Sequence, residues 1–437
     1  MVWHNRLEMK TAIVHYHLHP GGVTRIIGSQ VQGLLDVTKG GNLVVLCGNN
    51  DARTELAGVP ILELPCLQYL PADKPDIDLE KEAATIISRI KEHAEGFILH
   101  CHNPNLGKNP ALTLALYQLA RERYRIVNHC HDFAEDRPLN LETLNRMAVK
   151  SGLIIHDVLY PDFPGYHFVV LNSADYKRIL DARIPEGRVH LVPNPVSVPA
   201  NIPETGKSDL RRKIIEQLSL APDRNLCTYP VRAINRKNIG ELILLGVLFE
   251  DTCQFLVTQA PKNPDEIPGY ERWKELCTQQ GIRIKFEAGD VVNHEELIGI
   301  SDFCITTSTR EGFGMVFLEP WVAGTPVSGR DLPGITGDLR NFGLEFPGLY
   351  KQILVESGKG ICDFAEIGRE GQEDIITRAR SSLSERNKIH RLNPFLGSLF
   401  TVPKPGVLEK NREIILKHFS VSSYGQKLLE IYKALPQ

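Results

Sequence analysis

The sequence predicts an α/β protein made of two similar halves, each a doubly wound parallel sheet. Three observations predict this class. Apolar segments with the length of buried strands alternate with segments whose apolar residues recur at helical spacing. Four prolines in residues 192–203 exclude a regular element there and indicate a linker between the halves. With 437 residues, the chain is also too long for one ordinary hydrophobic core.

In the first half, an apolar segment at 10–16 is expected to form the first buried strand. A turn with Gly21 and Gly22 follows, and residues 23–35 have the apolar spacing of a helix. Ligands of a parallel sheet bind beyond the carboxyl ends of its strands, so this turn is a candidate binding element. The remaining elements expected in this half are strands at 42–47, 96–101, 125–130 and 167–172 and helices at 79–93, 110–121 and 173–180.

The second half repeats the alternation and then loses it beyond Gly334. Helical pieces within 363–384 and a loop at 392–405 are expected there, and the role of the segment 337–406 stays open. Two amphipathic helices at 408–419 and 423–435 end the sequence. The earlier elements of this half are strands at 225–230, 254–258 and 282–287 and helices at 238–249, 269–279 and 294–300.

Composition bounds the class of protein. Apolar residues make up 42% and charged residues 24%, which is typical of a soluble globular protein. A formal charge of −3 gives no electrostatic footprint for nucleic acid. The longest apolar runs, such as 242–249, are too short for a membrane span, and residues 1–10 lack the apolar core of a signal peptide. Nine cysteines without a Cys-x-x-Cys pair fit a reducing cytoplasm. We therefore expect a cytoplasmic protein, with peripheral membrane attachment left open.

One polar loop in the second half carries the pattern expected of a ligand site. A predicted strand at 302–307 leads into Glu311, which Gly312 and Gly314 follow closely. A helix is expected to begin near Phe313 and to end at Gly324. Glycines at a helix start expose backbone N–H groups, and the helix dipole there favours an anion.

A second carboxylate, Glu319, follows Glu311 after seven intervening residues, and Pro320 should kink the expected helix. This spacing resembles the Glu-x7-Glu signature of retaining, nucleotide-sugar-dependent glycosyltransferases of family four. In that family the first Glu contacts the transferred sugar and the second contacts the nucleotide ribose. Backbone around Gly312, Phe313 and Gly314 is accordingly assigned to donor binding. A strand–loop–helix unit with unrelated acidic residues is the alternative.

The resemblance implies a GT-B fold, in which two doubly wound, Rossmann-like lobes face each other across a cleft. It also implies that the last helix crosses back to the first lobe. We accordingly expect an N-terminal acceptor-side domain at 1–198 with a helix at 420–437, and a nucleotide-sugar-binding domain at 199–419. Closure of the lobes around the linker is expected to complete the site.

Cations at a strand end in the second half fit the same chemistry. Arg232 and Lys237, five residues apart, match the Arg and Lys with which the family binds the donor diphosphate, and Asn238 departs from the Gly usual after the Lys. Cations can neutralise the leaving diphosphate in place of a metal, so we expect no cofactor and no essential metal. A solvated basic loop is the alternative.

Histidines concentrate in the first half, which holds twelve of the fifteen. Two His-Cys-His tripeptides, 100–102 and 129–131, each end a predicted strand, and alternation places both His of each on one face. His15, His17 and His19 form a third alternating set. Three interpretations stay open: a zinc or iron site, buried structural histidines, or a polar wall that holds donor hexose and acceptor.

Several residues of the first half become site candidates through the resemblance. His131 and Asp132 look like the His-Asp at this strand end in the family, where the His touches the donor sugar. The Gly-Gly turn resembles one near the donor phosphates, for Gly22, and near the acceptor, for Gly21. The other candidates for binding an acceptor, with a surface helix start or a solvated loop as the alternative, are His102, Asn103, Lys108 and Asp132.

The implied activity is retaining transfer of glucose or mannose from UDP-glucose or GDP-mannose to a small hydroxyl acceptor, which the basic residues of the first half suggest is anionic. Glu311, His131, Arg232 and Lys237 are the expected catalytic residues. Alternatives are a glycoside phosphorylase or sugar-nucleotide epimerase of the same fold, or a sugar-binding protein with a degenerate site. The donor base, the acceptor and the oligomeric state are not determined by the sequence.

Overall fold

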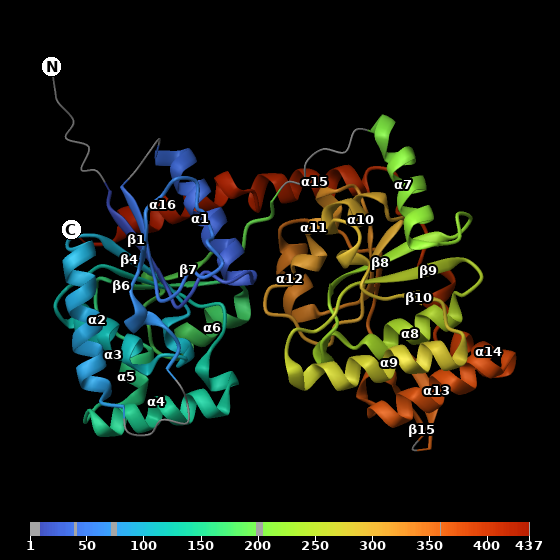
Figure 1. Cartoon of the computed structure of the whole chain (residues 1–437), viewed down its shortest axis with the longest axis horizontal. Helices are drawn as coiled ribbons and strands as arrows, with labels where there is room; N and C mark the ends of the chain where they lie inside the picture. Colours follow the sequence, from blue (N-terminus) through green and yellow to red (C-terminus); the bar gives the residue numbers. More distant parts are fainter. Residues whose placement is uncertain (1–8, 39–41, 71–76, 198–203, 359, 437) are drawn as a thin grey trace. The chain divides into compact units, whose positions relative to one another are not determined.

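The structure is a computed structural model that describes residues 9–38, 42–70, 77–197, 204–358 and 360–436. The chain divides into two compact units: an N-terminal unit of Met1–Pro195 with His418–Gln437, and a C-terminal unit of Val196–Lys417. The domain boundary expected at 198/199 falls in 198–203, outside the described residues. Each unit contains a parallel sheet with helices on both faces (Figure 1).

The N-terminal unit is built on a seven-stranded parallel sheet with the order β3-β2-β1-β4-β5-β6-β7. Its strands are β1 (Thr11–His15), β2 (Leu43–Cys47), β3 (Ile61–Glu63), β4 (Ile98–His102), β5 (Ile126–His129), β6 (Tyr166–Val170) and β7 (Val189–Leu191). Its helices are α1 (Gly22–Thr38), α2 (Leu79–Ala94), α3 (Pro110–Arg121), α4 (Pro138–Lys150), α5 (Ile155–Leu159), α6 (Ser173–Asp181) and α16 (Val421–Ala434). Every strand and helix expected for this half is confirmed, whereas β3, β7, α4 and α5 were not anticipated.

Central strands are buried on both faces because helices cover both sides of the sheet. All five residues of β1 are buried, and β1 lies between β2 and β4. One face packs on α2 and α3 and forms the larger apolar core. The opposite face packs on α1 and α16, and it is this face that carries the histidines.

The last helix, α16, packs against α1 within the N-terminal unit, as expected (Figure 1). The two helices cross where Gly33 of α1 meets Gly425 of α16. A Cβ on Gly33 would lie 2.5 Å from the carbonyl oxygen of Val421 and 3.1 Å from Cα of Gly425. Backbone therefore contacts backbone at this crossing, and only glycine fits. The close approach brings Tyr432 of α16 against the sheet.

The C-terminal unit has a six-stranded parallel sheet with the order β10-β9-β8-β11-β12-β13 and an antiparallel hairpin, β14-β15. Its strands are β8 (Asn225–Arg232), β9 (Cys253–Gln259), β10 (Ile284–Lys285), β11 (Phe303–Thr306), β12 (Val327–Arg330), β13 (Gly348–Tyr350), β14 (Leu354–Ser357) and β15 (Gly360–Asp363). Its helices are α7 (Glu204–Leu218), α8 (Ile239–Leu248), α9 (Ile267–Gln280), α10 (His294–Ile300), α11 (Glu319–Val322), α12 (Pro333–Asn341), α13 (Arg369–Ser381), α14 (Leu383–Leu392) and α15 (Val407–His418).

The prediction of one helix from Phe313 to Gly324 is wrong. Residues after β11 form a loop, a 3-10 turn η8 (Met315–Phe317) and the four-residue helix α11. Gly314 has a φ of 84°, a left-handed conformation that interrupts a regular helix. Pro320 therefore lies in the first turn of α11, where its missing N–H costs nothing, and it kinks no helix.

The segment 337–406, whose role the sequence left open, covers part of the sheet in the C-terminal unit. Helix α13 packs on α8, and the buried residues of this segment join the same apolar core as the central strands. The helical pieces expected within 363–384 are confirmed: the turn η9 (Phe364–Glu366), α13 and the start of α14 lie there, and Ser382 separates α13 from α14.

A buried ion cluster ties the same segment to the sheet. Arg330, the last residue of β12, pairs with Glu241 of α8 and with Asp363 of β15, the latter at 2.7 Å. The hydroxyl of Tyr350 donates to Glu241 at 2.6 Å. Because Glu241 is fully buried, these partners stabilise a charge that would otherwise lack solvation.

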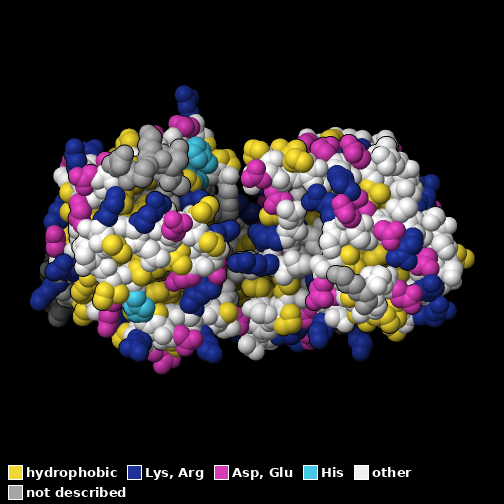
Figure 2. Space-filling view, turned by 90° about the horizontal axis from the view of Figure 1, so that it is seen from below, with side chains coloured by type: hydrophobic (Ala, Val, Ile, Leu, Met, Phe, Trp, Pro, Cys, Tyr) yellow, Lys and Arg dark blue, Asp and Glu magenta, His cyan; other side chains and the backbone are white. Residues whose placement is uncertain are grey.

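Charge on the surface is mixed. In the face shown in Figure 2, lysine and arginine side chains lie among aspartates and glutamates in each unit. No helix among the described residues combines the length and the apolar character that crossing a bilayer requires.

Candidate active site

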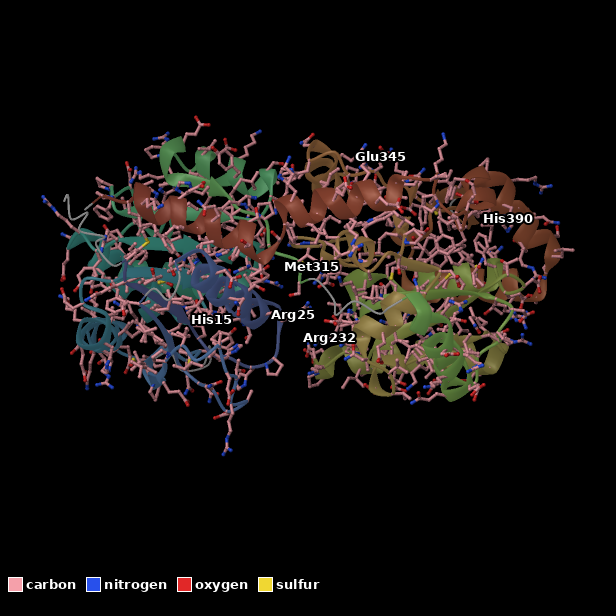
Figure 3. All side chains as sticks on the ribbon, turned by 90° about the horizontal axis from the view of Figure 1, so that it is seen from above. His15, Arg25, Arg232, Met315, Glu345 and His390 are labelled. Carbon is pink, nitrogen blue, oxygen red and sulfur yellow. The ribbon has the colours of Figure 1, made fainter. Side chains whose placement is uncertain are left out.

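Two of the predicted donor-binding cations lie at the carboxyl end of β8. Arg232 is the last residue of β8 (Figure 3), and Lys237 ends the 3-10 turn η5 (Asn235–Lys237) just before α8. Nε of Arg232 is buried without a hydrogen-bond partner among the described residues. Such a group is costly unless an anion or another acceptor satisfies it.

Lys237, Arg236 and Glu311 form an ion cluster at this strand end. Nζ of Lys237 pairs with Oε1 of Glu311, and Nη1 of Arg236 lies 3.0 Å from Oε2 of Glu311. The side chains of Lys237 and Glu311 are only 9% and 7% exposed. Burial lowers the pKa of Lys237, and the charge of Glu311 opposes this effect. A cation in such a poorly solvated place attracts an anionic ligand more strongly than it would in water.

Hydrogen bonds hold η5 in place. The hydroxyl of Tyr229 donates to the carbonyl oxygen of Lys237, and the hydroxyl of Thr307 lies 3.0 Å from the carbonyl oxygens of both Lys237 and Asn238. Asn238 has a φ of 52°, in the left-handed region that asparagine tolerates better than most residues. This conformation explains how an asparagine stands where the resembled family usually has glycine.

The glycine loop after β11 offers an approach to bare backbone. Among the described residues, and apart from its two chain neighbours, no atom lies within 4 Å of the place where a Cβ of Gly312 would be, whereas a Cβ on Gly314 would lie 2.8 Å from the ring of Phe317. Gly314 is therefore required by packing, and Gly312 leaves space for a ligand. Phe313 is buried, and Glu319 is the half-buried first residue of α11. The long helix that begins beside the cations is α8, so the dipole argument applies to α8.

Histidines of the N-terminal unit gather on one face of its sheet, at the carboxyl ends of the central strands. His15 ends β1 (Figure 3), His100 and His102 lie in β4, and His129 ends β5, paired with His102 in the sheet register. Cys101 packs into the apolar core on the opposite face, as the alternation predicted. All of these side chains are buried.

The histidines are joined by side-chain hydrogen bonds that meet at Gln30 of α1. In one arm, Nε2 of Gln30 donates to the hydroxyl of Tyr432 at 3.0 Å. That hydroxyl lies 2.8 Å from Nδ1 of His100, and Nε2 of His100 lies 3.1 Å from Nδ1 of His129. Nε2 of His129 is buried without a partner among the described residues.

The other arm leads to His131. Oε1 of Gln30 lies 2.7 Å from Nε2 of His102, and Nδ1 of His102 lies 2.9 Å from Nε2 of His131. The backbone N–H of His131 donates to Oδ1 of Asn103 at 2.6 Å, which fixes the start of the loop after β5. His131 itself is half-buried.

Burial keeps these histidines neutral. Together with a smaller effect of neighbouring histidines, it lowers the pKa of His15 and of His100 to about 3. The same causes lower the pKa well below its usual range in His102, His129 and His131.

The remaining acceptor candidates differ in what they offer. Both ring nitrogens of His102 and the side-chain oxygen of Asn103 have protein partners, which tie these two residues to His131. Their role in acceptor binding stays a prediction. Asp132 is 46% exposed and pairs with Arg137 at 3.5 Å. Lys108 places its Nζ 5.8 Å from the ring centre of Tyr69.

Two further candidates lie in the turn before α1. The carbonyl oxygen of Gly21 accepts a hydrogen bond from the backbone of Arg25, and Gly22 is the first residue of α1. The turn thus forms the start of a seventeen-residue helix, where backbone N–H groups favour an anion.

His100, His102 and His129 are also the group that could hold a metal ion, since one nitrogen from each lies within 4.8 Å of the others. Zinc bound at its usual distance to nitrogen brings its ligand atoms about 3.3 Å apart. The zinc or iron interpretation therefore stays a prediction.

No family model matches the sequence. The sequence is 28% identical over 326 residues to a mannosylglucosyl-3-phosphoglycerate synthase of Petrotoga mobilis, a match that covers 70% of this chain and 62% of that protein. It is 26% identical over 321 residues to a mannosylglucosylglycerate synthase of the same organism, covering 66% of this chain and 70% of that protein. The chain thus spans less than two thirds of the length of the first relative.

Solved structures show the same architecture at low sequence identity. Anabaena HepE in complex with UDP has a TM-score of 0.62 at 14% identity, covering 98% of this chain and 100% of that chain. A glycosyltransferase from Rickettsia africae has a TM-score of 0.62 at 17% identity, with 98% of both chains covered. The fold is GT-B. Sucrose-phosphate synthase from Thermosynechococcus elongatus shares it, with a TM-score of 0.60 at 15% identity over 98% of this chain and 99% of that one.

Two residues of the N-terminal unit that hydrogen-bond to the histidines, Gln30 and Tyr432, were not predicted from the sequence. Gln30 lies among Ile26, Ile27 and Val31 on the buried side of α1. A polar residue on an apolar helical face needs a buried hydrogen-bond partner. The position of Gln30 in this apolar pattern could therefore have marked it as a buried polar residue. Tyr432 offers no such signal, because tyrosine is common on half-apolar helices.

Proposed function

We propose that the chain is a retaining glycosyltransferase that moves glucose or mannose from a nucleotide diphosphate sugar to a small anionic hydroxyl acceptor. The observation that carries the proposal is the cluster of Lys237, Arg236 and Glu311 beside Arg232 at the end of β8. It supplies buried positive charge for a diphosphate and a carboxylate for sugar hydroxyls.

Comparisons with known proteins support this activity. Both relatives from Petrotoga mobilis are named as synthases of mannosylglucosylglycerate compounds, and one name contains a phosphoglycerate. Anabaena HepE was crystallised with UDP-glucose as well as with UDP. We propose UDP-glucose or GDP-mannose as the donor and a glyceric acid derivative as the acceptor. Lys108 and the start of α1 are proposed to bind the charged group of the acceptor.

The proposed reaction proceeds on one face of the sugar. The acceptor oxygen bonds to the anomeric carbon as the bond from that carbon to the phosphate oxygen breaks, and the acceptor proton passes to the leaving diphosphate. Arg232 and Lys237 neutralise the charge that develops there, so no divalent ion is needed for it. Glu311 is proposed to hold the hexose and Glu319 the ribose, and a contact with a sugar is proposed for His131.

The test measures nucleoside diphosphate release and product configuration. Purified protein is incubated with each donor and with glycerate or 3-phosphoglycerate acceptors, and NMR reports the anomeric proton of the product. Lys237→Ala and Glu311→Gln should lower kcat/KM by roughly 100-fold or more. Lys213→Ala, on an exposed position of α7, is the matched control and should retain full activity. Near-wild-type turnover in both site variants, or an inverted product, would overturn the proposal.

A further inference from the structure

The side-chain network around Gln30 has a direction that follows from its chemistry. An amide oxygen only accepts hydrogen bonds, and an amide nitrogen only donates them. Oε1 of Gln30 lies 2.7 Å from Nε2 of His102, so that nitrogen carries the proton. Neutral histidine has one N–H, and Nδ1 of His102 is therefore an acceptor. The next ring nitrogen, Nε2 of His131 at 2.9 Å, must be the donor.

In the other arm, Gln30 donates a hydrogen bond instead of accepting one. Nε2 of Gln30 donates a hydrogen bond to the hydroxyl oxygen of Tyr432. The O–H of Tyr432 in turn donates a hydrogen bond to Nδ1 of His100. His100 in turn donates from Nε2 to Nδ1 of His129. One neutral tautomer is thus assigned to every ring, and each close contact has one donor and one acceptor.

We propose that Gln30 sets the tautomer of His131, so that this histidine presents an unprotonated Nδ1 to ligands and accepts a hydrogen bond from a hydroxyl group. Gln30 and His102 are positioning residues, because they act on His131 and have no ligand contact of their own. Identification of the hydroxyl as one of a sugar rests on the proposed function. The tautomer itself does not, since it follows from the orientation of the Gln30 amide, whose oxygen is placed toward His102.

Rotating the Gln30 amide by half a turn would reverse both arms. Its nitrogen would donate to His102, which would donate to His131 and leave the proton on Nδ1 of His131. His131 would then offer a donor where it now offers an acceptor. A substrate hydroxyl can meet either, but a group without a proton, such as a carboxylate or phosphate, would be accepted only in the reversed network. With the amide oxygen of Gln30 toward His102, the network selects hydroxyl groups and disfavours bare anions at His131.

Burial makes this selection effective. Gln30 and His102 are at most 1% exposed, and Tyr432 is 2% exposed, so water cannot replace a missing partner cheaply. The neutral state of the rings is also required, because an imidazolium donates from both nitrogens and would remove the direction.

Nitrogen-15 NMR of histidine-labelled, full-length protein tests the inference without reference to activity. The resonances of His131 are identified by their loss in His131→Gln. Wild-type protein should show the proton on Nε2 and a bare Nδ1 for His131, and the same tautomer for His102. A proton on Nδ1 of His131, or a stoichiometric metal ion found by elemental analysis to occupy the ring nitrogens, would overturn the proposal.

Two variants separate Gln30 from the rest of the network. Gln30→Met removes the partner of both arms, and His131 should then show a mixture of tautomers. Tyr432→Phe interrupts only the arm to His100 and should leave the tautomer of His131 unchanged. If Gln30→Met does not fold, the wild-type tautomer and the Tyr432→Phe result still decide the matter: a changed His131 tautomer in Tyr432→Phe would contradict the assignment.

Kinetics give a second readout once transfer has been shown. Loss of one aligned hydrogen bond should lower kcat/KM roughly three- to tenfold in Gln30→Met, whereas Tyr432→Phe should stay within twofold. A purely structural role would instead reduce activity and thermal stability together in both variants. Absence of transfer by the wild-type protein would count against the proposed function alone and leave the NMR result standing.

Discussion

Lowering the pH below about 6.5 should destabilise the N-terminal unit selectively. His15, His100, His102 and His129 are at most 3% exposed, and burial holds their pKa far below that of a histidine in the unfolded chain, about 6.5. The unfolded chain therefore binds more protons than the folded one between about pH 6.5 and pH 3. The stabilisation is fully present above pH 6.5 and is lost as the pH falls.

The magnitude follows from proton linkage. Each histidine that stays neutral in the folded state and becomes protonated on unfolding costs about 1.4 kcal/mol per pH unit below its unfolded pKa. A histidine of the unfolded chain is already half-protonated at pH 6.5, so each of the four contributes about 1 kcal/mol over the next pH unit, and the N-terminal unit should lose about 4 kcal/mol between pH 6.5 and pH 5.5. That is comparable to the whole stability of many domains, roughly 5–15 kcal/mol.

Hydrogen exchange followed by mass spectrometry can separate the two units. Peptides that span β4 and β5 should lose protection steeply below pH 6.5, after correction for the intrinsic exchange rate. Trp273 and Trp321 lie in the C-terminal unit, so their fluorescence in a Trp3→Phe background reports that unit and should change less. His129→Phe should reduce the pH slope by about one proton, and His156→Gln, with a half-exposed side chain, should not. Protection of β4 and β5 that stays constant to pH 5.5 would refute the reasoning.

Three further perturbations follow from packing and charge. Arg330→Met leaves Glu241 buried without its cation and should cost about 3–5 kcal/mol in urea unfolding followed by tryptophan fluorescence, and a loss below about 1 kcal/mol would contradict the role given to the ion cluster. Gly425→Ala forces a Cβ into α1 and should cost about 1–3 kcal/mol, seen as faster exchange in α1 and α16, whereas Ala434→Ser at the end of α16 is a control without that clash. Asn103→Ala removes the acceptor for the backbone N–H of His131 and should lower transferase kcat/KM roughly tenfold, with little change in nucleotide affinity. An unchanged kcat/KM would contradict the role of Asn103 in positioning His131.

Much of the fold was predictable because local sequence patterns, such as apolar runs and helix-capping residues, indicate its strands and helices. Strand β2 is continuously apolar, and β1, β4 and β5 each contain an apolar run and are buried along their whole length. The starts of α3 and α10 are marked by Pro110 and by the cap Asn293. Strands β3 and β7 were missed because they are three residues long and half-exposed, which leaves no periodicity to detect.

The errors have local physical causes. The loop after β11 carries enough apolar residues to suggest a long helix, but Gly314 adopts a left-handed conformation and Pro320 begins a separate short helix. The partners in long-range pairs could not be identified from the sequence. Arg330 and Glu241 are 89 residues apart, and Gln30 and Tyr432 are 402 apart, so only the fold reveals that each pair is in contact.

Candidate site residues were predictable to the extent that they share a strand end. Arg232 and Lys237 are close in sequence, and the bond of Lys237 to Glu311 follows from the adjacency of β8 and β11 in the sheet. The alternation of the His-Cys-His tripeptides was also predictable. Which histidines face a ligand was not, because that depends on α1 and α16 covering His100 and His102.

Binding of a nucleoside diphosphate, measured by isothermal titration calorimetry, tests the central claim most directly. UDP or GDP should bind the wild-type protein, and Arg232→Ala or Lys237→Ala should each weaken that binding roughly 10- to 100-fold, since each removes a charge-assisted hydrogen bond. Lys213→Ala should bind as the wild type does. Equal affinity in all four proteins, or a complex in which the diphosphate lies away from the end of β8, would contradict the account.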